Sequence, residues 1–166
     1  MATCTTSQNS PGKNVAVGVA LDVCGDADIN ALTYLPLGTI NSKQLSYAAT
    51  TADTTNDQSG ATTSEIIVRS GLELAVSGFL TSADSALSAQ NALITYYWAE
   101  INAGRQPTVW IKISGPSYPR VWHIYMNYKG GDEGFETDSA QTGTFNFGVT
   151  DTGTVANLAV NLSAAP

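Results

Sequence analysis

The chain has 166 residues, enough for one domain with a sizeable core, and 43% of them are hydrophobic, which excludes an intrinsically disordered protein. Only 13% are Asp, Glu, Lys or Arg, about half the share in typical soluble domains, which fits either a surface largely covered by other subunits or a secreted Thr/Ser-rich β protein. The net charge of −7 excludes tight binding to a phosphate backbone, because that needs clustered Lys and Arg.

Residues 1–14 are polar, include Pro11 and Gly12, and predict an N-terminal arm. They lack the basic and apolar regions of a signal peptide, and no apolar run in the chain approaches the roughly 18 residues of a membrane-spanning helix. Cys4 and Cys24 are too few for a disulfide framework, so two free thiols are expected, with one disulfide as the alternative. The expectation is a soluble protein made in the cytoplasm, without membrane contact.

Two strand patterns open the main domain, which is expected to span residues 15–155. Residues 15–24 place an apolar side chain at every second position, which is typical of a strand with one buried face. A second strand region covers residues 34–40. Pro36 lies inside it and cannot donate to a ladder, so it belongs at a sheet edge or at the start of a strand.

Residues 48–64 form a long segment without a large apolar or a basic side chain, and two interpretations fit it. One is a surface loop without a role, and the other is an assembly loop that orders against a neighbouring subunit. Ordering the backbone costs about 1–2 kcal/mol per residue, which a partner surface would offset. Loops beyond about 12–15 residues are usually functional or disordered. The candidate contact residues are Thr51, Asp53, Thr54, Asp57, Ser59 and Gly60.

Residues 65–80 predict a long strand with a bulge at Ser70 and Gly71. Its apolar side chains share one face: Leu72, Leu74 and Val76. Glu73 lies on the opposite face, because side chains alternate along a strand.

Residues 84–103 predict the only helix, with Ser82 or Asp84 as its cap and Gly104 just beyond its end. Apolar residues at helical spacing form a stripe that is expected to be buried on the outside of the β core: Leu93, Ile94, Tyr97, Trp98 and Ile101. Strands over residues 108–114, 121–128 and 136–150 follow, and the chain ends in a C-terminal arm over 156–166, with one more short strand from Val155 as the alternative. The order predicts a mainly β (α+β) fold with one flanking helix.

No motif for catalysis, a cofactor or a metal is present. The single histidine, His123, is expected to be a polar side chain on a sheet face, because no base–nucleophile pair accompanies it. Asp53 and Asp57 lack the glycine and glutamate of a calcium loop. Acids near a late turn fit a glycosidase pair but are more often solvated: Glu133, Glu136 and Asp138. The chain is expected not to be an enzyme.

Five short sequence motifs follow one another between residues 32 and 155. They are a strand ending in Leu-Gly at 37–38, the Thr/Asp/Asn/Ser/Gly-rich stretch 50–60, a Gly-Leu strand from 71, the helix exit G-x-x-x-x-V-x-I at 104–111 and G-T-F-x-F at 143–147. In the order and spacing of these motifs, and in the length of the domain, the chain resembles the major tail tube proteins of long-tailed phages with non-contractile tails.

The resemblance implies two packed antiparallel β-sheets, in a sandwich or barrel-like arrangement, beside one helix. It further implies six-subunit rings that stack into a tube, with the sheets of adjacent subunits joined edge to edge. The implied function is a structural virion protein of the tail, through whose lumen DNA passes without specific binding. The implied partners are further copies of the chain, a tape measure protein, and terminator and tail tip proteins.

The excess of acids predicts a negative lumen, which would repel DNA rather than hold it. The candidate lining residues are Glu65, Glu73, Glu136 and Asp138. Glu73 is the strongest candidate, because its side chain faces away from Leu72 and Leu74. The alternative is that these acids only solubilise the outer surface. Two other functions also fit the sequence: another ring protein of a tail or secretion machine (terminator, baseplate hub or secretion tube), and a secreted Thr-rich carbohydrate-binding module.

Overall fold

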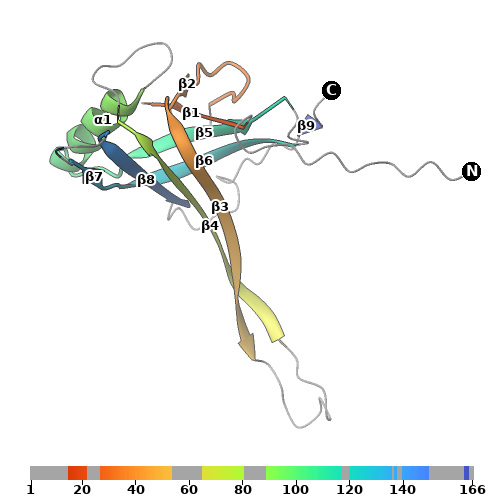
Figure 1. Cartoon of the computed structure of the whole chain (residues 1–166). Coiled ribbons are helices and arrows are strands. Elements are labelled where there is room, and N and C mark those ends of the chain that lie inside the picture. The colour runs from red at the N-terminus through yellow and green to blue at the C-terminus, as the bar shows by residue number, and fades with distance from the viewer. Residues whose placement is uncertain are drawn as a thin grey trace, which may run out of the picture.

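Alternating apolar residues organise most of the chain into β-strands, which the computed structural model shows with one helix among the residues it describes (Figure 1). The described residues are 15–21, 27–53, 65–80, 89–116, 120–135, 137, 140–149 and 163–164. The elements are β1 (Ala16–Ala20), β2 (Leu35–Pro36), β3 (Ile40–Asp53), β4 (Glu65–Phe79), α1 (Gln90–Asn102), β5 (Thr108–Ser114), β6 (Arg120–Gly130), β7 (Glu133–Gly134), β8 (Thr142–Val149) and β9 (Ser163–Ala164).

The strands pair antiparallel in one path with the order β2-β1-β5-β6-β8-β4-β3, while β7 adds to β8 and β9 to the start of β6. The path bends at β6, which pairs with β5 over residues 122–127 and with β8 over residues 126–130. In Figure 1, β3, β4 and β8 therefore cross in front of β5 and β6. The mainly β class with one helix is confirmed, and the two expected sheets are the two halves of one curved sheet.

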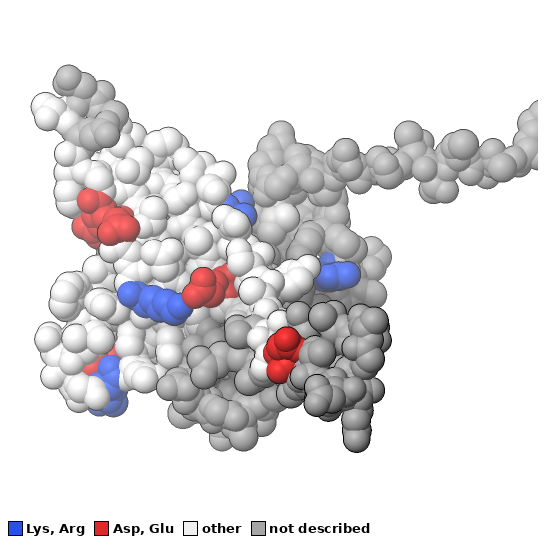
Figure 2. Space-filling view, turned by 90° about the horizontal axis from the view of Figure 1, so that it is seen from below, with Lys and Arg blue, Asp and Glu red and all other residues white. Residues whose placement is uncertain are grey.

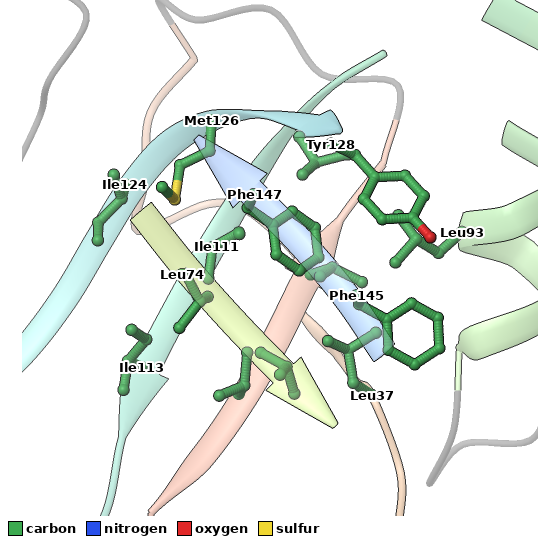
Figure 3. Close-up of a cluster of buried hydrophobic side chains, with 14 of the residues drawn as sticks. Leu37, Leu74, Leu93, Ile111, Ile113, Ile124, Met126, Tyr128, Phe145 and Phe147 are labelled. Carbon is green, nitrogen blue, oxygen red and sulfur yellow. The ribbon is translucent and has the colours of Figure 1, made fainter. Parts of the chain in front are cut away.

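The two halves of the sheet enclose the hydrophobic core. Figure 3 shows Leu74 of β4 and Phe147 of β8 facing Ile111 of β5 and Met126 of β6, and each of these side chains is at most 2% exposed. Burying one such side chain stabilises the fold by about 1.5–3 kcal/mol relative to leaving it in water. Leu93 of α1 is also fully buried against this cluster, so the helix packs on the core as expected.

The buried face of α1 differs from the expected stripe. Leu93 is fully buried, but Trp98 is 57% exposed and Ile101 is 44% exposed, so the expectation of a buried Trp98 was wrong. Successive residues of a helix differ by about 100°, and the polar residues Gln90 and Glu100 lie on the face of Leu93 instead. Gln90 and Glu100 can be buried because both side chains are hydrogen-bonded. Because both are polar, the apolar pattern of the sequence did not place them on the buried face of α1.

Hydrogen bonds explain how these two polar side chains are accommodated. Gln90 Nε2 donates to the carbonyl oxygen of Phe79 at 3.0 Å, which ties the first turn of α1 to the end of β4. Glu100 accepts two bonds from Arg105, at 2.6 and 2.8 Å, and this pairing lowers the pKa of the carboxyl. The first turn of the helix is thus fixed to β4, whereas Glu100 is satisfied by the segment directly after the helix.

The helix ends where the sequence predicted, with Gly104 in the left-handed conformation (φ 70°) directly after it. Its start is at Gln90, and Ala89 before it provides no side-chain cap. The expected first turn, with Ser82 and Asp84, lies outside the described residues. At 13 residues, α1 is too short to cross a bilayer, and no other helix occurs in the described ranges.

Two strand boundaries and the position of a bulge also differ from the expectation. The region 34–40 divides into β2 and the start of β3, and residues 48–53 belong to β3 rather than to a loop. Ser70 and Gly71 pair regularly with β3, and the irregularity lies at Val68, which is skipped between Arg69 and Ile67. The predicted bulge was therefore two to three residues too late. A threonine-rich strand with two polar faces has no apolar alternation, so the sequence pattern could not reveal it.

Candidate assembly surfaces

The outer half of the β3–β4 hairpin projects from the domain. β3 follows β4 from Ile40 to Asp53, whereas β8 accompanies β4 only from Glu73 to Phe79. Residues 47–53 and 65–72 therefore form a two-stranded ribbon, called the ribbon below, which Figure 1 shows running away from the sheet. An isolated two-stranded hairpin is marginally stable in water, so the ribbon calls for additional contacts.

Both edges of the ribbon lack a strand partner in the part of the chain that the structure describes. β3 is the last strand of the path, and β4 has no neighbour on its other side before Glu73. Each free edge presents a row of backbone N–H and C=O groups that can pair with another chain. The ribbon can therefore be covered by strands of two different neighbours.

The candidate contact residues divide between described and undescribed segments. Thr51 and Asp53 lie in β3, near the outer end of the ribbon, and both are exposed. They belong to a strand and not to the loop that was expected to contain them. Thr54, Asp57, Ser59 and Gly60 lie outside the described residues.

The outward face of β4 is polar and carries little charge. Glu73 and Ala75 are exposed on it, and their partners across the sheet are Ser46 and Gln44 of β3. Leu72, Leu74 and Val76 are buried on the other face, so the predicted alternation is confirmed. Figure 2, seen from below the view of Figure 1, shows only scattered charged groups on the described part of this surface, some of them as acidic and basic neighbours in contact.

Glu73 forms an ion pair on this face. Its Oε1 accepts a hydrogen bond from Lys129 Nζ at 2.7 Å, and this bond and the lysine charge lower the pKa of the carboxyl. Lys129 reaches β4 across Gly148 of β8, where any Cβ would collide with its side chain. Both partners are more than half exposed, so the pair neutralises charge more than it stabilises the fold.

The other three candidate lining residues are not placed. Glu136 and Asp138 lie outside the described residues, and only the backbone of Glu65 is described, at the start of β4. Glu73 is thus the one candidate whose surroundings are known, and its charge has a basic partner within the same subunit.

A hollow of about 500 Å³ opens between α1 and the end of β6. Four aromatic side chains line it, and Tyr97 is in edge-to-face contact with both Trp98 and Tyr128, at 5.4 and 5.2 Å between ring centroids. Asp132 and Glu133 lie at its border. The pKa of Tyr128 is raised by burial and by the nearby Glu133 and Tyr97. We call this site the aromatic–acidic pocket; its lining residues are Ile94, Tyr97, Trp98, Tyr128, Lys129, Gly130, Gly131, Asp132, Glu133, Thr144 and Phe145.

Solved structures resemble this domain over nearly its whole length, although no family model and no curated protein matches the sequence. A chain from the tail of an empty gene transfer agent particle, refined with C6 helical symmetry, has a TM-score of 0.67 at 12% identity and covers 94% of this chain and 100% of its own. The SPP1 tail tube protein has a TM-score of 0.59 at 10% identity, over 93% of this chain and 78% of its own. The chain has the tail tube fold.

A third solved structure shares the tail tube fold but comes from a different assembly. A chain of the anti-feeding prophage baseplate has a TM-score of 0.60 at 8% identity and covers 99% of both chains. The fold that the sequence motifs implied is therefore confirmed, including the single helix beside the β core. TM-scores of 0.59–0.67 establish the fold, whereas identities of 8–12% leave the function to be argued from the surfaces.

His123 lies on the tail tube fold as a packed polar side chain. It is 7% exposed, and its Nδ1 is 3.0 Å from the hydroxyl of Tyr34. Lys112 Nζ lies 5.6 Å from the centre of the Tyr34 ring. Burial and the Lys112 charge lower the pKa of His123, and burial raises that of Tyr34 to about 12. The described residues contain no group of three His, Cys, Asp or Glu side chains that could hold a metal ion.

Sequence reasoning did not find the aromatic–acidic pocket of this tail tube fold. Trp98 was expected in the core, and the acids after β6 were interpreted as a solvated turn. The pocket combines α1 with residues 128–133 and with β8, and no spacing along the chain indicates that these segments meet. One feature of the sequence could have indicated the pocket: a Gly-Gly-Asp-Glu turn directly after an aromatic strand.

Proposed function

We propose that the chain is a structural subunit that polymerises as stacked hexameric rings into a phage tail tube, the conduit for DNA. The ribbon carries this proposal, because a domain with the tail tube fold projects two strand edges that have no partner among its described residues. Pairing of these edges with neighbouring copies would continue the sheet from subunit to subunit. The low charged fraction of 13% agrees with a surface that is mostly covered by other copies.

We further propose where the subunit lies in the virion and which proteins it contacts. The subunit would lie in the virion tail, around a tape measure protein before DNA passes, and would end against terminator and tail tip proteins. The gene transfer agent tail that shares its fold has C6 symmetry, which supports a ring of six. DNA would pass without specific binding, because the outward polar face carries few cations and Lys129 is already paired with Glu73.

The lumen is proposed to be negative, with Glu65, Glu73, Glu136 and Asp138 as candidate lining residues. The support is the total of 14 acidic against 7 basic residues, summed over six copies in each ring. Because Lys129 neutralises the charge of Glu73, the other three acids would contribute more of the negative potential in the lumen. Tubes with Glu73→Lys and Glu136→Lys should assemble yet eject DNA slowly, and unchanged ejection rates would argue against a lumenal position for these acids.

A second function is favoured by one observation. The baseplate chain of the anti-feeding prophage matches this chain over 99% of both lengths, so a ring protein of a baseplate or secretion machine fits the same domain. Copy number separates the two, because a tube contains very many copies and a hub or terminator contains one ring. Nothing in the described surfaces specifically favours a secreted carbohydrate-binding module.

Electron microscopy of the purified protein tests the proposal. The expected result is long hollow tubes with six subunits per ring, formed above a threshold concentration. Single closed rings that never stack would favour the terminator or hub instead. A chain that stays monomeric at high concentration, in several salt conditions, would contradict both.

A further inference from the structure

The aromatic–acidic pocket has the chemistry of a site for an organic cation. Trp98 is 57% exposed at its wall, and an exposed indole face attracts a guanidinium or ammonium group. Glu133 contributes a carboxylate that has no ion-pair partner among the described residues. Asp132 contributes a second carboxylate, whose Oδ2 accepts a hydrogen bond from the Thr144 hydroxyl at 3.4 Å, while the Asp132 backbone N–H donates to the same hydroxyl at 3.0 Å.

The cation already at the pocket does not satisfy these carboxylates. Lys129 lines the pocket, but its Nζ is bound to Glu73 on the outward face of the sheet. The pocket is therefore an aromatic surface with an excess of negative charge, and it can accept a basic side chain from outside the domain.

Arg120 is a basic side chain that is available for such a contact. It is exposed at the first residue of β6, and no ion pair engages it within the described part of the chain. The other basic side chains that are described have contacts: Arg105 with Glu100, Lys129 with Glu73, Lys112 with the Tyr34 ring, and Lys43 with a further partner.

Arg120 and the pocket lie at opposite ends of the same strand. β6 has 11 residues, so its ends are about 30 Å apart at the usual rise of a strand. Figure 1 shows this separation, with β9 beside the Arg120 end and α1 and β7 beside the other. Arg120 therefore cannot reach the pocket of its own subunit.

We propose that Arg120 of one copy inserts into the aromatic–acidic pocket of a second copy, stacking on Trp98 and pairing with Glu133. A surface that carries a group at one end and its receptor at the other makes heterologous contacts, which generate closed rings or open helical stacks. Arginine suits the site because its planar guanidinium stacks on an aromatic face while donating two bonds to a carboxylate. The inference rests on the proposed function and names a contact through which copies join.

A charge swap tests the contact. Arg120→Glu and Glu133→Arg should each raise the threshold concentration for assembly by about tenfold or more, because each places like charges together at every contact. The double variant Arg120→Glu with Glu133→Arg should assemble close to the wild-type threshold. Asp28→Arg is the matched control, because it makes the same charge change as Glu133→Arg at an exposed turn outside the pocket.

Each outcome of this experiment has a clear meaning. Wild-type assembly with unchanged thresholds in the single variants overturns the contact and leaves the proposed function standing. Loss in the single variants without rescue in the swap also overturns it, because the two residues then do not face each other. A wild-type chain that never assembles contradicts both proposals. If a reversed charge prevents folding, Arg120→Gln and Glu133→Gln replace it, and each should still raise the threshold.

Discussion

The two halves of the β3–β4 hairpin are held by different forces. In the inner half, Leu74 and Val76 are buried and β4 pairs with β8 as well as with β3. In the outer half, the ribbon, β4 pairs with β3 alone, and Leu72 at its base is the side chain that reaches the core. Burial thus explains the inner half, whereas a two-stranded ribbon alone is only marginally stable in water. The proposed assembly would supply the outer half with the strand partners that it lacks among the described residues.

Removal of the ribbon tip should produce the largest difference between the two halves. Deleting residues 51–60 should abolish tube formation while changing the free energy of unfolding of the monomer by about 1 kcal/mol or less, because this segment contains no large apolar side chain. Electron microscopy and urea denaturation measure the two effects. Normal tubes from the deletion variant would show that the ribbon is not an assembly contact.

A pair of aromatic substitutions compares the halves by stability. Phe147→Ala in the core should cost about 3–5 kcal/mol, the usual penalty for a buried large aromatic, because Phe147 is 1% exposed. Tyr47→Ala on β3 should cost at most about 0.5 kcal/mol in the monomer, because Tyr47 is 76% exposed. Urea denaturation of dilute monomers measures both. Equal losses would contradict the division between core and ribbon.

Trp98 extends the comparison to the helix. Trp98→Ala should destabilise the monomer by about 1 kcal/mol, well below the cost of a buried tryptophan, because more than half of the side chain is already in water. In assembled protein the same change should matter more, since the proposed contact covers the indole. Acrylamide quenching of Trp98 fluorescence, with the other two tryptophans replaced by phenylalanine, should fall on assembly. Unchanged quenching would place Trp98 outside the interface.

The smallest expected effect concerns His123 in the body of the sheet. Its pKa in the folded chain is below the ordinary value of 6.5, so below about pH 6.5 the unfolded chain binds a proton that the folded chain does not. Stability should therefore fall as the pH drops from 7 through 6.5, and it is fully present above that range. Because the chain has one histidine, His123→Asn should remove this dependence between pH 7 and 5.5. Urea midpoints across that interval measure it.

Sequence reasoning succeeded where one side of an element is buried and the other is not. Residues 108–114 were predicted as a strand and form β5 with the same bounds, because Val109, Ile111 and Ile113 alternate with more polar neighbours. The end of α1 was likewise predicted, because a glycine in the left-handed conformation leaves a recognisable mark. Both signals are local, and tertiary structure did not alter them.

The failures have three physical causes: a strand without a buried face, polar side chains that hydrogen bonds allow to be buried, and a contact between residues far apart in sequence. The ribbon strand over residues 48–53 has no apolar alternation, since neither of its faces is buried in the subunit. The inner face of α1 includes Gln90 and Glu100, whose partners are the Phe79 carbonyl and Arg105. The ion pair between Glu73 and Lys129 spans 56 positions of the chain. Composition predicted that other subunits cover much of the surface, but it could not indicate which residues they would contact.

The two free edges of the ribbon have a consequence for the kinetics of growth. A copy inside a tube would have both edges covered, whereas a copy at the growing end would have one, and the first copies to meet would order their ribbons before enough partners are present. Ordering backbone without its partners costs entropy, so nucleation should be slow and elongation fast, with a lag that shortens when preformed tubes are added as seeds. Copies would also be lost from the two ends and not from the middle, which makes the ends the points where the length of a tube is decided.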